Sequence, residues 1–118
     1  MNLNLISLKV NDWEQMVKFY QHVVGLEPIV LEPEHQYGWL DAEGVRLSIL
    51  GTKDLAPAEN ARLSLQFEVH DLIEEMRKLE EMGCVFFDKQ LDTGEPYRMA
   101  QFRDPEGNAI AIYELLSQ

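Results

Sequence analysis

The chain has 118 residues, of which 46% are hydrophobic, and its 21 acidic and 10 basic residues give a formal net charge of −11. This length fits one domain with a single core, and the hydrophobic share excludes a disordered chain. The acidic balance argues against nucleic-acid binding, because no basic cluster offsets repulsion from phosphates.

The sequence predicts a cytoplasmic protein. No apolar stretch approaches the roughly 20 residues that a membrane helix needs, so we expect no membrane contact. The first residues, MNLNL, lack the basic segment and apolar core of a signal peptide. Cys84 is the single cysteine, so no internal disulfide can form, as is usual in the cytoplasm.

The first half predicts the order strand, helix, strand, strand, strand. Hydrophobic alternation favours a strand over residues 3–10. Asp12 can cap the following helix, and Gly25 can end it in a left-handed conformation. The other strands are expected at residues 29–31, 35–40 and 45–50, with a DAEG turn at 41–44.

The second half predicts the same order after a linker at residues 51–60. Asp71 can cap a helix that Gly83 ends. The strands of this half are expected at residues 62–69, 85–88, 97–102 and 109–113.

The two halves therefore have the same pattern, which indicates a duplicated module. Residues 39–50 (WLDAEGVRLSIL) match residues 102–113 (FRDPEGNAIAIY), and residues 5–12 (LISLKVND) match residues 64–71 (SLQFEVHD). We expect an α+β fold for a single domain, 1–118, made of two repeats at about 1–53 and 61–118. Its two tandem β-α-β-β-β modules should form a half-open, eight-stranded, barrel-like sheet with the helices on the convex side.

Side chains on a strand alternate between its two faces, which assigns a concave side to each module. Small residues at facing positions should leave a hollow there, with aromatic side chains near its mouth, as in many ligand sites. The alternatives are that aromatic side chains fill the space or that a partner subunit covers it. The candidate ligand-binding residues are Leu5, Trp39, Arg46, Ser48, Ser64, Gln66, Glu68, Phe102, Ala111 and Tyr113.

The chain resembles the vicinal oxygen chelate superfamily over essentially its whole length. The resemblance is carried by the paired modules, by Phe19 and Tyr20 before Gly25, and by residues 102–108 (FRDPEGN). That superfamily includes glyoxalase I, extradiol dioxygenases, fosfomycin-resistance enzymes and bleomycin-resistance proteins.

The resemblance implies a metal site whose usual ligands are a His on the first strand of a module and a Glu on the last. Those positions fall on Leu5, Ser48, Ser64 and Ala111. None of these supplies a carboxylate, imidazole or thiolate, and a divalent ion needs several converging donors. The positions of the three histidines, His22, His35 and His70, do not form a replacement site. We therefore expect no metal and no other cofactor.

Three functions stay open. The first is a metal-free, glyoxalase- or bleomycin-resistance-like protein that binds a small molecule, with drug sequestration as one form of this role. In that case Trp39 and Tyr113 would stack on the ligand and Glu68 would favour a cation. The second is a glyoxalase-like lyase, isomerase or ring-cleaving dioxygenase, in which Arg46 could hold a carboxylate. The third is a non-catalytic partner domain.

Among these, the sequence favours binding without catalysis. No residue is assigned a catalytic role, because Ser48 and Ser64 have no nearby His–acid pair in the sequence. Open sheet edges and the resemblance both favour a homodimer.

Overall fold

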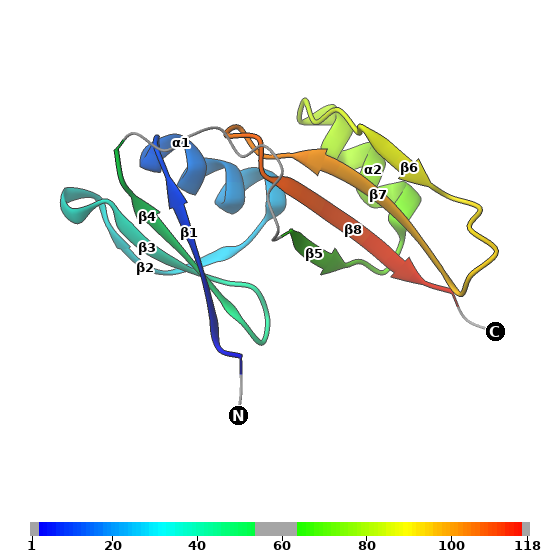
Figure 1. Cartoon of the computed structure of the whole chain (residues 1–118), viewed down its shortest axis with the longest axis horizontal. Helices are drawn as coiled ribbons and strands as arrows, with labels where there is room; N and C mark the ends of the chain where they lie inside the picture. The colour runs from blue at the N-terminus through cyan, green and yellow to red at the C-terminus, as the bar shows by residue number, and fades with distance from the viewer. Residues whose placement is uncertain (1–2, 54–63, 117–118) are drawn as a thin grey trace. The chain divides into compact units, whose positions relative to one another are not determined.

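The structure, a computed structural model, describes residues 3–53 and 64–116. The chain divides into two compact units, unit 1 (Met1–Pro57) and unit 2 (Ala58–Gln118), each of which has one four-stranded sheet (Figure 1). The predicted α+β class and two-module arrangement are confirmed. The boundary falls inside the predicted linker, and the single-domain organisation stays a prediction. No helix in the described part of the chain is long and apolar enough to cross a bilayer.

Unit 1 contains sheet A, in which the strands lie in the order β1-β4-β3-β2. β1 runs parallel to β4, whereas β3 is antiparallel to both β4 and β2. The elements of unit 1 are β1 (Leu5–Val10), α1 (Trp13–Lys18), the π-helix η1 (Phe19–Val24), β2 (Glu27–Glu32), the 3-10 helix η2 (Pro33–His35), β3 (Tyr37–Asp41) and β4 (Arg46–Gly51).

α1 packs on one face of sheet A. The Asp12 carboxylate accepts the Gln15 N–H at 3.1 Å, which confirms Asp12 as the helix cap. The Trp13 indole N–H donates to the Ile49 carbonyl at 3.0 Å and so ties α1 to β4. The buried apolar residues of this unit are Val10, Trp13, Met16, Val17, Tyr20, Leu40, Leu47 and Ile49.

The second half of the first predicted helix is a π-helix, which the 3.6-residue periodicity did not indicate. Gly25, at φ 93°, donates its N–H to the Tyr20 carbonyl five residues back at 3.1 Å. Tyr20 is fully buried at this point. The wider turn therefore coincides with a large core side chain and with the left-handed glycine that ends the helix.

Unit 2 repeats this arrangement in sheet B, with the strand order β5-β8-β7-β6. β5 runs parallel to β8, and the other neighbouring pairs are antiparallel. The elements are β5 (Leu65–Glu68), α2 (Leu72–Glu81), β6 (Asp88–Gln90), β7 (Tyr97–Arg103) and β8 (Ala109–Leu115).

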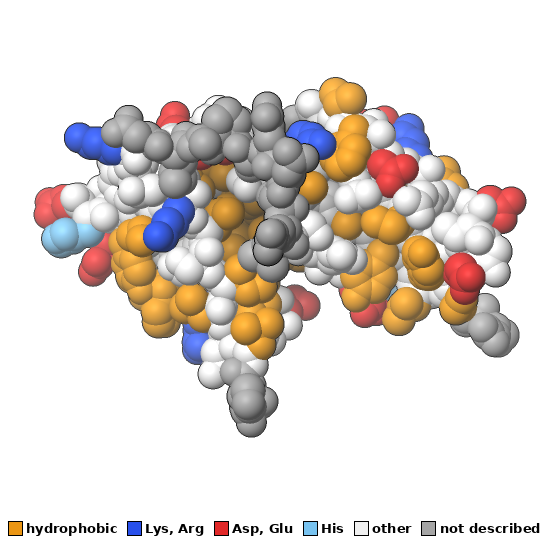
Figure 2. Space-filling view, viewed as in Figure 1, with side chains coloured by type: hydrophobic (Ala, Val, Ile, Leu, Met, Phe, Trp, Pro, Cys, Tyr) orange, Lys and Arg blue, Asp and Glu red, His pale blue; other side chains and the backbone are white. Residues whose placement is uncertain are grey.

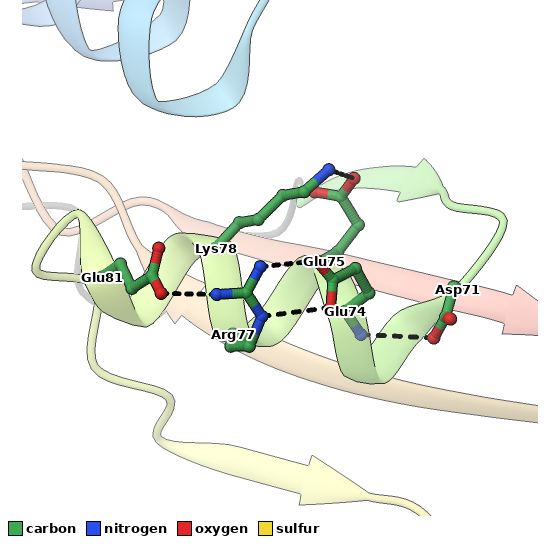
Figure 3. Close-up of polar contacts among 6 residues, drawn as sticks. All are labelled: Asp71, Glu74, Glu75, Arg77, Lys78 and Glu81. Carbon is green, nitrogen blue, oxygen red and sulfur yellow. Dashed lines mark hydrogen bonds and ion pairs between the residues drawn. The ribbon is translucent and has the colours of Figure 1, made fainter.

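α2 is capped by Asp71, whose carboxylate accepts the Glu74 N–H at 3.2 Å. Leu72, Met76 and Leu79 form its buried stripe. On its exposed side, Arg77 bonds Glu74 at 2.6 Å and Glu81 at 2.5 Å (Figure 3). This helix therefore has one apolar side toward sheet B and one ion-paired side.

One predicted strand is displaced. The sequence favoured a strand at 85–88, whereas β6 begins at Asp88. Val85 is 81% exposed, and the half-buried Phe86 has its ring centroid 5.6 Å from that of Phe102, so this apolar run is an irregular segment and not a strand. Pairing with β7 starts only where the Phe87 N–H donates to the Gln101 carbonyl at 3.0 Å.

Candidate functional site

Each sheet has a face that packs on its own helix and an opposite face, called here the distal face. On sheet A the strand register aligns three rows of side chains on the distal face. From one end to the other these rows are Leu5–Arg46–Asp41, Ser7–Ser48–Trp39 and Lys9–Leu50–Tyr37. All four unit 1 residues of the candidate site, Leu5, Trp39, Arg46 and Ser48, thus lie on the distal face of sheet A.

Trp39 is the centre of an ordered cluster on this face. The Arg46 guanidinium carbon lies 5.7 Å from the centroid of the Trp39 ring. The Tyr37 ring lies on the other side, with its centroid 6.1 Å from that of Trp39 and the ring planes tilted by 58°. Between these long side chains, Ser48 is only 4% exposed. The cluster offers an aromatic surface, a cation and hydroxyl groups at one place.

Sheet B carries a different set of groups on its distal face. The register aligns Gln66 with Ala111 and Gln101, and Glu68 with Tyr113 and Met99. Ser64 comes just before β5, and its hydroxyl accepts the Gln66 amide at 3.4 Å. The structure therefore places Gln66, Glu68, Ala111 and Tyr113 on one face and Ser64 at its edge.

Asp88 joins this face through a hydrogen-bond network that the sequence analysis missed. One oxygen, Oδ2, accepts the side-chain amides of Gln90 and Gln101, each at 2.9 Å. The other carboxylate oxygen and both glutamine carbonyl oxygens remain to accept hydrogen bonds from a ligand. The predicted strand ended at Asp88, so the sequence analysis left Gln90 outside the strand and did not relate it to Asp88. The alternation of Asp88 with Gln90 was the available signal.

Phe102 does not lie where the sequence analysis placed it. It pairs with Ile110 on the helix face of sheet B and is 1% exposed. Its ring contacts Phe86 edge-on. The corresponding position in the first repeat is Trp39, which lies on the distal face, so the two aromatic residues that align in sequence point to opposite sides of their sheets.

The donor chemistry at the four positions where the family resemblance implies metal ligands does not fit a divalent ion. Leu5 and Ala111 have no donor atom, and Ser48 and Ser64 have neutral hydroxyls. Within residues 3–53 and 64–116, no three His, Cys, Asp or Glu side chains lie close enough to hold a metal.

A surface cleft of about 630 Å³ opens elsewhere in unit 1. It lies where the start of α1 approaches η2, and it includes none of the ten candidate residues. Its lining residues are Asn11, Asp12, Trp13, Glu14, Pro33 and Gln36. Asp12 caps α1, Trp13 is bonded to β4, and Glu14 forms an ion pair with Lys18 at 3.1 Å, so these side chains already serve the local fold.

Known proteins share this architecture. The solved glyoxalase family protein from Enterococcus faecalis has a TM-score of 0.78 and 19% identity, covering 96% of this chain and 97% of its own. A glyoxalase/dioxygenase from Nostoc punctiforme has a TM-score of 0.77 and 15% identity, covering 98% of this chain and 92% of its own. At these identities, the likeness shows the fold alone.

The sequence comparisons identify the family. The uncharacterized protein YraH of Bacillus subtilis (strain 168) is 33% identical over 128 residues, covering 98% of this chain and 100% of YraH. The model of the glyoxalase/bleomycin resistance protein/dioxygenase superfamily matches residues 2–112. These matches confirm the resemblance seen in the motifs, and the chain belongs to the glyoxalase/bleomycin resistance protein/dioxygenase superfamily.

Proposed function

We propose that this protein binds a small organic molecule on the distal faces of its sheets, without a metal ion and without changing the ligand chemically. The supporting observation is that both units gather functional side chains on the face that their own helix does not cover. In each unit a small buried residue, Ser48 or Ala111, lies among longer polar or aromatic side chains. Few polar groups around an apolar or aromatic surface are typical of small-molecule sites.

The chemistry of these side chains supports binding rather than catalysis. The hydroxyls of Ser48 and Ser64 lie on faces whose other side chains include no histidine in the described rows. A serine nucleophile needs an adjacent base, and Lewis-acid chemistry needs a set of metal donors that these positions do not supply. The groups present are those that recognise a ligand: an indole, a guanidinium, amides and carboxylates.

Sequestration of a harmful compound is the biological role that we propose for this binding. Binding alone protects a cell when the protein is abundant and holds the compound tightly. The acceptor oxygens of Asp88, Gln90 and Gln101 suit ligands with N–H donors, including the cationic groups that the net charge of −11 favours.

The test is a thermal-shift screen of the purified protein against cationic glycopeptide-type drugs, small carboxylates and neutral aromatic compounds. A ligand at about 100 times its dissociation constant should stabilise the fold by roughly 2.7 kcal/mol. Mass spectrometry after prolonged incubation should recover each hit unchanged. Elemental analysis of protein from metal-supplemented medium should find no stoichiometric transition metal.

The outcomes separate the proposed function from its competitors. Conversion of a hit into product would make the protein an enzyme. Stoichiometric metal, lost together with binding on chelation, would contradict a metal-free site. A screen without any stabilising compound would contradict small-molecule binding and favour a partner domain.

A further inference from the structure

Arg46 differs from the other arginines that the structure describes. Arg77 bonds Glu74 and Glu81, and Arg98 bonds Glu114. Arg103 donates to the carbonyl oxygen of Gly107 at 3.0 Å. Over residues 3–53 and 64–116, the Arg46 guanidinium has no such acceptor and instead lies over the Trp39 ring. In a chain with 21 acids and 10 bases, a guanidinium without a hydrogen-bond acceptor is unexpected.

The nearest candidate acceptor in the sheet is Asp41, which is paired with Arg46 across β3 and β4. Its Oδ1 atom accepts the Glu43 N–H at 3.0 Å and so serves the turn between the two strands. Arg46 is directed to Trp39, its diagonal neighbour. A cation over an aromatic ring at an exposed site is held only weakly, so the guanidinium N–H groups are available to a ligand.

The row between the charged residues contains two small side chains, Ser7 and Ser48. Trp39 pairs with Ser48 and ends this row on β3. Arg46 lies in the row on one side and Lys9 in the row on the other. The two cationic rows are four residues apart along the strands, or about 13 Å, so both long side chains can reach over the serines.

We propose that this part of the distal face of sheet A binds a small aromatic acid, with Arg46 and Lys9 holding the carboxylate and Trp39 stacking on the ring. The inference rests on the small-molecule binding proposed above and specifies the ligand class for unit 1. A guanidinium presents a planar pair of N–H donors that matches the two oxygens of a carboxylate. An indole beside that pair favours a flat ring in offset or edge-on contact, so the acid and the ring are recognised together.

Isothermal titration of the full chain with four probes tests the proposal. Benzoate carries both features, benzamide has the ring without the charge, benzylamine has the ring with the opposite charge, and inorganic phosphate has negative charge without the ring. We expect benzoate to bind at least about tenfold more tightly than each of the other three. Its affinity should fall as salt is added, because the contact is between charges.

Substitutions test which residues bind benzoate. Arg46→Gln should lower benzoate affinity at least about tenfold and leave benzamide unchanged, whereas Arg46→Lys should keep part of the affinity because it keeps the charge. Arg103→Gln is the matched control, since Arg103 also lies over an aromatic ring, that of Phe87 at 4.4 Å, but has its N–H bonded to Gly107. Its benzoate affinity should equal that of the unmodified protein.

Tryptophan fluorescence gives a second readout. The chain has two tryptophans, and the other one, Trp13, is a buried residue of α1. Benzoate should change the emission of the unmodified protein, and Trp39→Phe should abolish the change. Thermal unfolding of each variant checks that the fold is kept.

Three results would overturn this inference while leaving the proposed function in place: equal binding of benzoate and benzamide, tighter binding of benzylamine or phosphate, or unchanged benzoate binding by Arg46→Gln. If benzoate does not bind but compounds of other classes stabilise the protein in the thermal-shift screen, this inference is also overturned and the proposed function remains. Failure of all four probes and of the whole screen would contradict both.

Discussion

Asp104 shows why the sequence of the second hairpin turn matters at the scale of one residue. It is 4% exposed, and its carboxylate accepts the backbone N–H groups of Glu106 and Asn108, each at 2.9 Å, and the Asn108 side-chain amide at 2.7 Å. Its equivalent in the first repeat, Asp41, is exposed and accepts one N–H, that of Glu43. The same sequence pattern therefore stabilises the turn of unit 2 through more side-chain hydrogen bonds than the turn of unit 1.

The pair yields a prediction for stability. Asp104→Ala should lower the free energy of unfolding by about 2–4 kcal/mol, because it leaves several partly buried donors without an acceptor. Asp41→Ala should lower it by less than about 1 kcal/mol, since water can replace the lost acceptor at an exposed turn. Urea unfolding of both variants measures the difference, and equal losses would show that the buried bonds do not stabilise this turn.

At the scale of elements, Glu114 joins three of them in unit 2. Its Oε1 atom on β8 accepts the Leu72 N–H at the start of α2 at 2.9 Å and bonds Arg98 of β7 at 3.0 Å. The Leu72 N–H is the main reason that the pKa of Glu114 is lowered, and Arg98 adds to it. One carboxylate thus caps the helix and links it to two neighbouring strands.

The lowered pKa predicts how stability depends on pH. The carboxylate is charged more readily in the folded state, so its contribution is complete above the ordinary pKa of a glutamate and is lost as pH falls through the lowered folded value. Unfolding followed by circular dichroism from about pH 7 to about pH 3 should show a stability decline that Glu114→Gln reduces.

Glu75→Gln is the control for this experiment, because the Glu75 side chain makes only an exposed contact, at 3.8 Å, with Lys78 (Figure 3). Such surface pairs contribute about 0–1 kcal/mol. This variant should retain the pH dependence of the unmodified protein. If Glu114→Gln retains it as well, another carboxylate is responsible.

At the scale of the whole molecule, sheet A has an edge strand that is exposed along its entire length. All six residues of β2 are exposed, including Ile29 at 46%, Val30 at 37% and Leu31 at 39%. Hydrophobic side chains are visible over this part of unit 1 in the space-filling view (Figure 2). An exposed apolar edge strand readily associates with another chain, which supports the homodimer expected from the sequence.

We therefore expect sedimentation equilibrium at micromolar concentration to give the mass of a dimer, about twice the 13.7 kDa of one chain. Val30→Lys should shift the equilibrium toward the monomer, because it places a charge on the apolar edge. Val85→Lys is the control, since Val85 is more exposed but lies outside any strand. A monomer for the unmodified chain, or dimers for both variants, would contradict an interface at β2.

The amino-acid sequence by itself determined the two β-α-β-β-β modules, their helix caps and the family. These depend on local signals: hydrophobic periods of two or about four residues, the capping acids Asp12 and Asp71, and glycines in left-handed turns. Each signal acts over a few residues of the chain, so it can be read without knowing which strands are neighbours.

Only the tertiary structure decided which side chains share a face and what each contacts. In the observed register, Phe102 lies on the helix face of sheet B. Trp39, its equivalent in the first repeat, lies on the distal face of sheet A. Pairing between β6 and β7 brought Asp88 to Gln101, and the diagonal arrangement of β3 and β4 directed Arg46 to Trp39 rather than Asp41. Such choices depend on contacts between residues distant in the sequence, where a one-residue change of register exchanges the two faces of a strand.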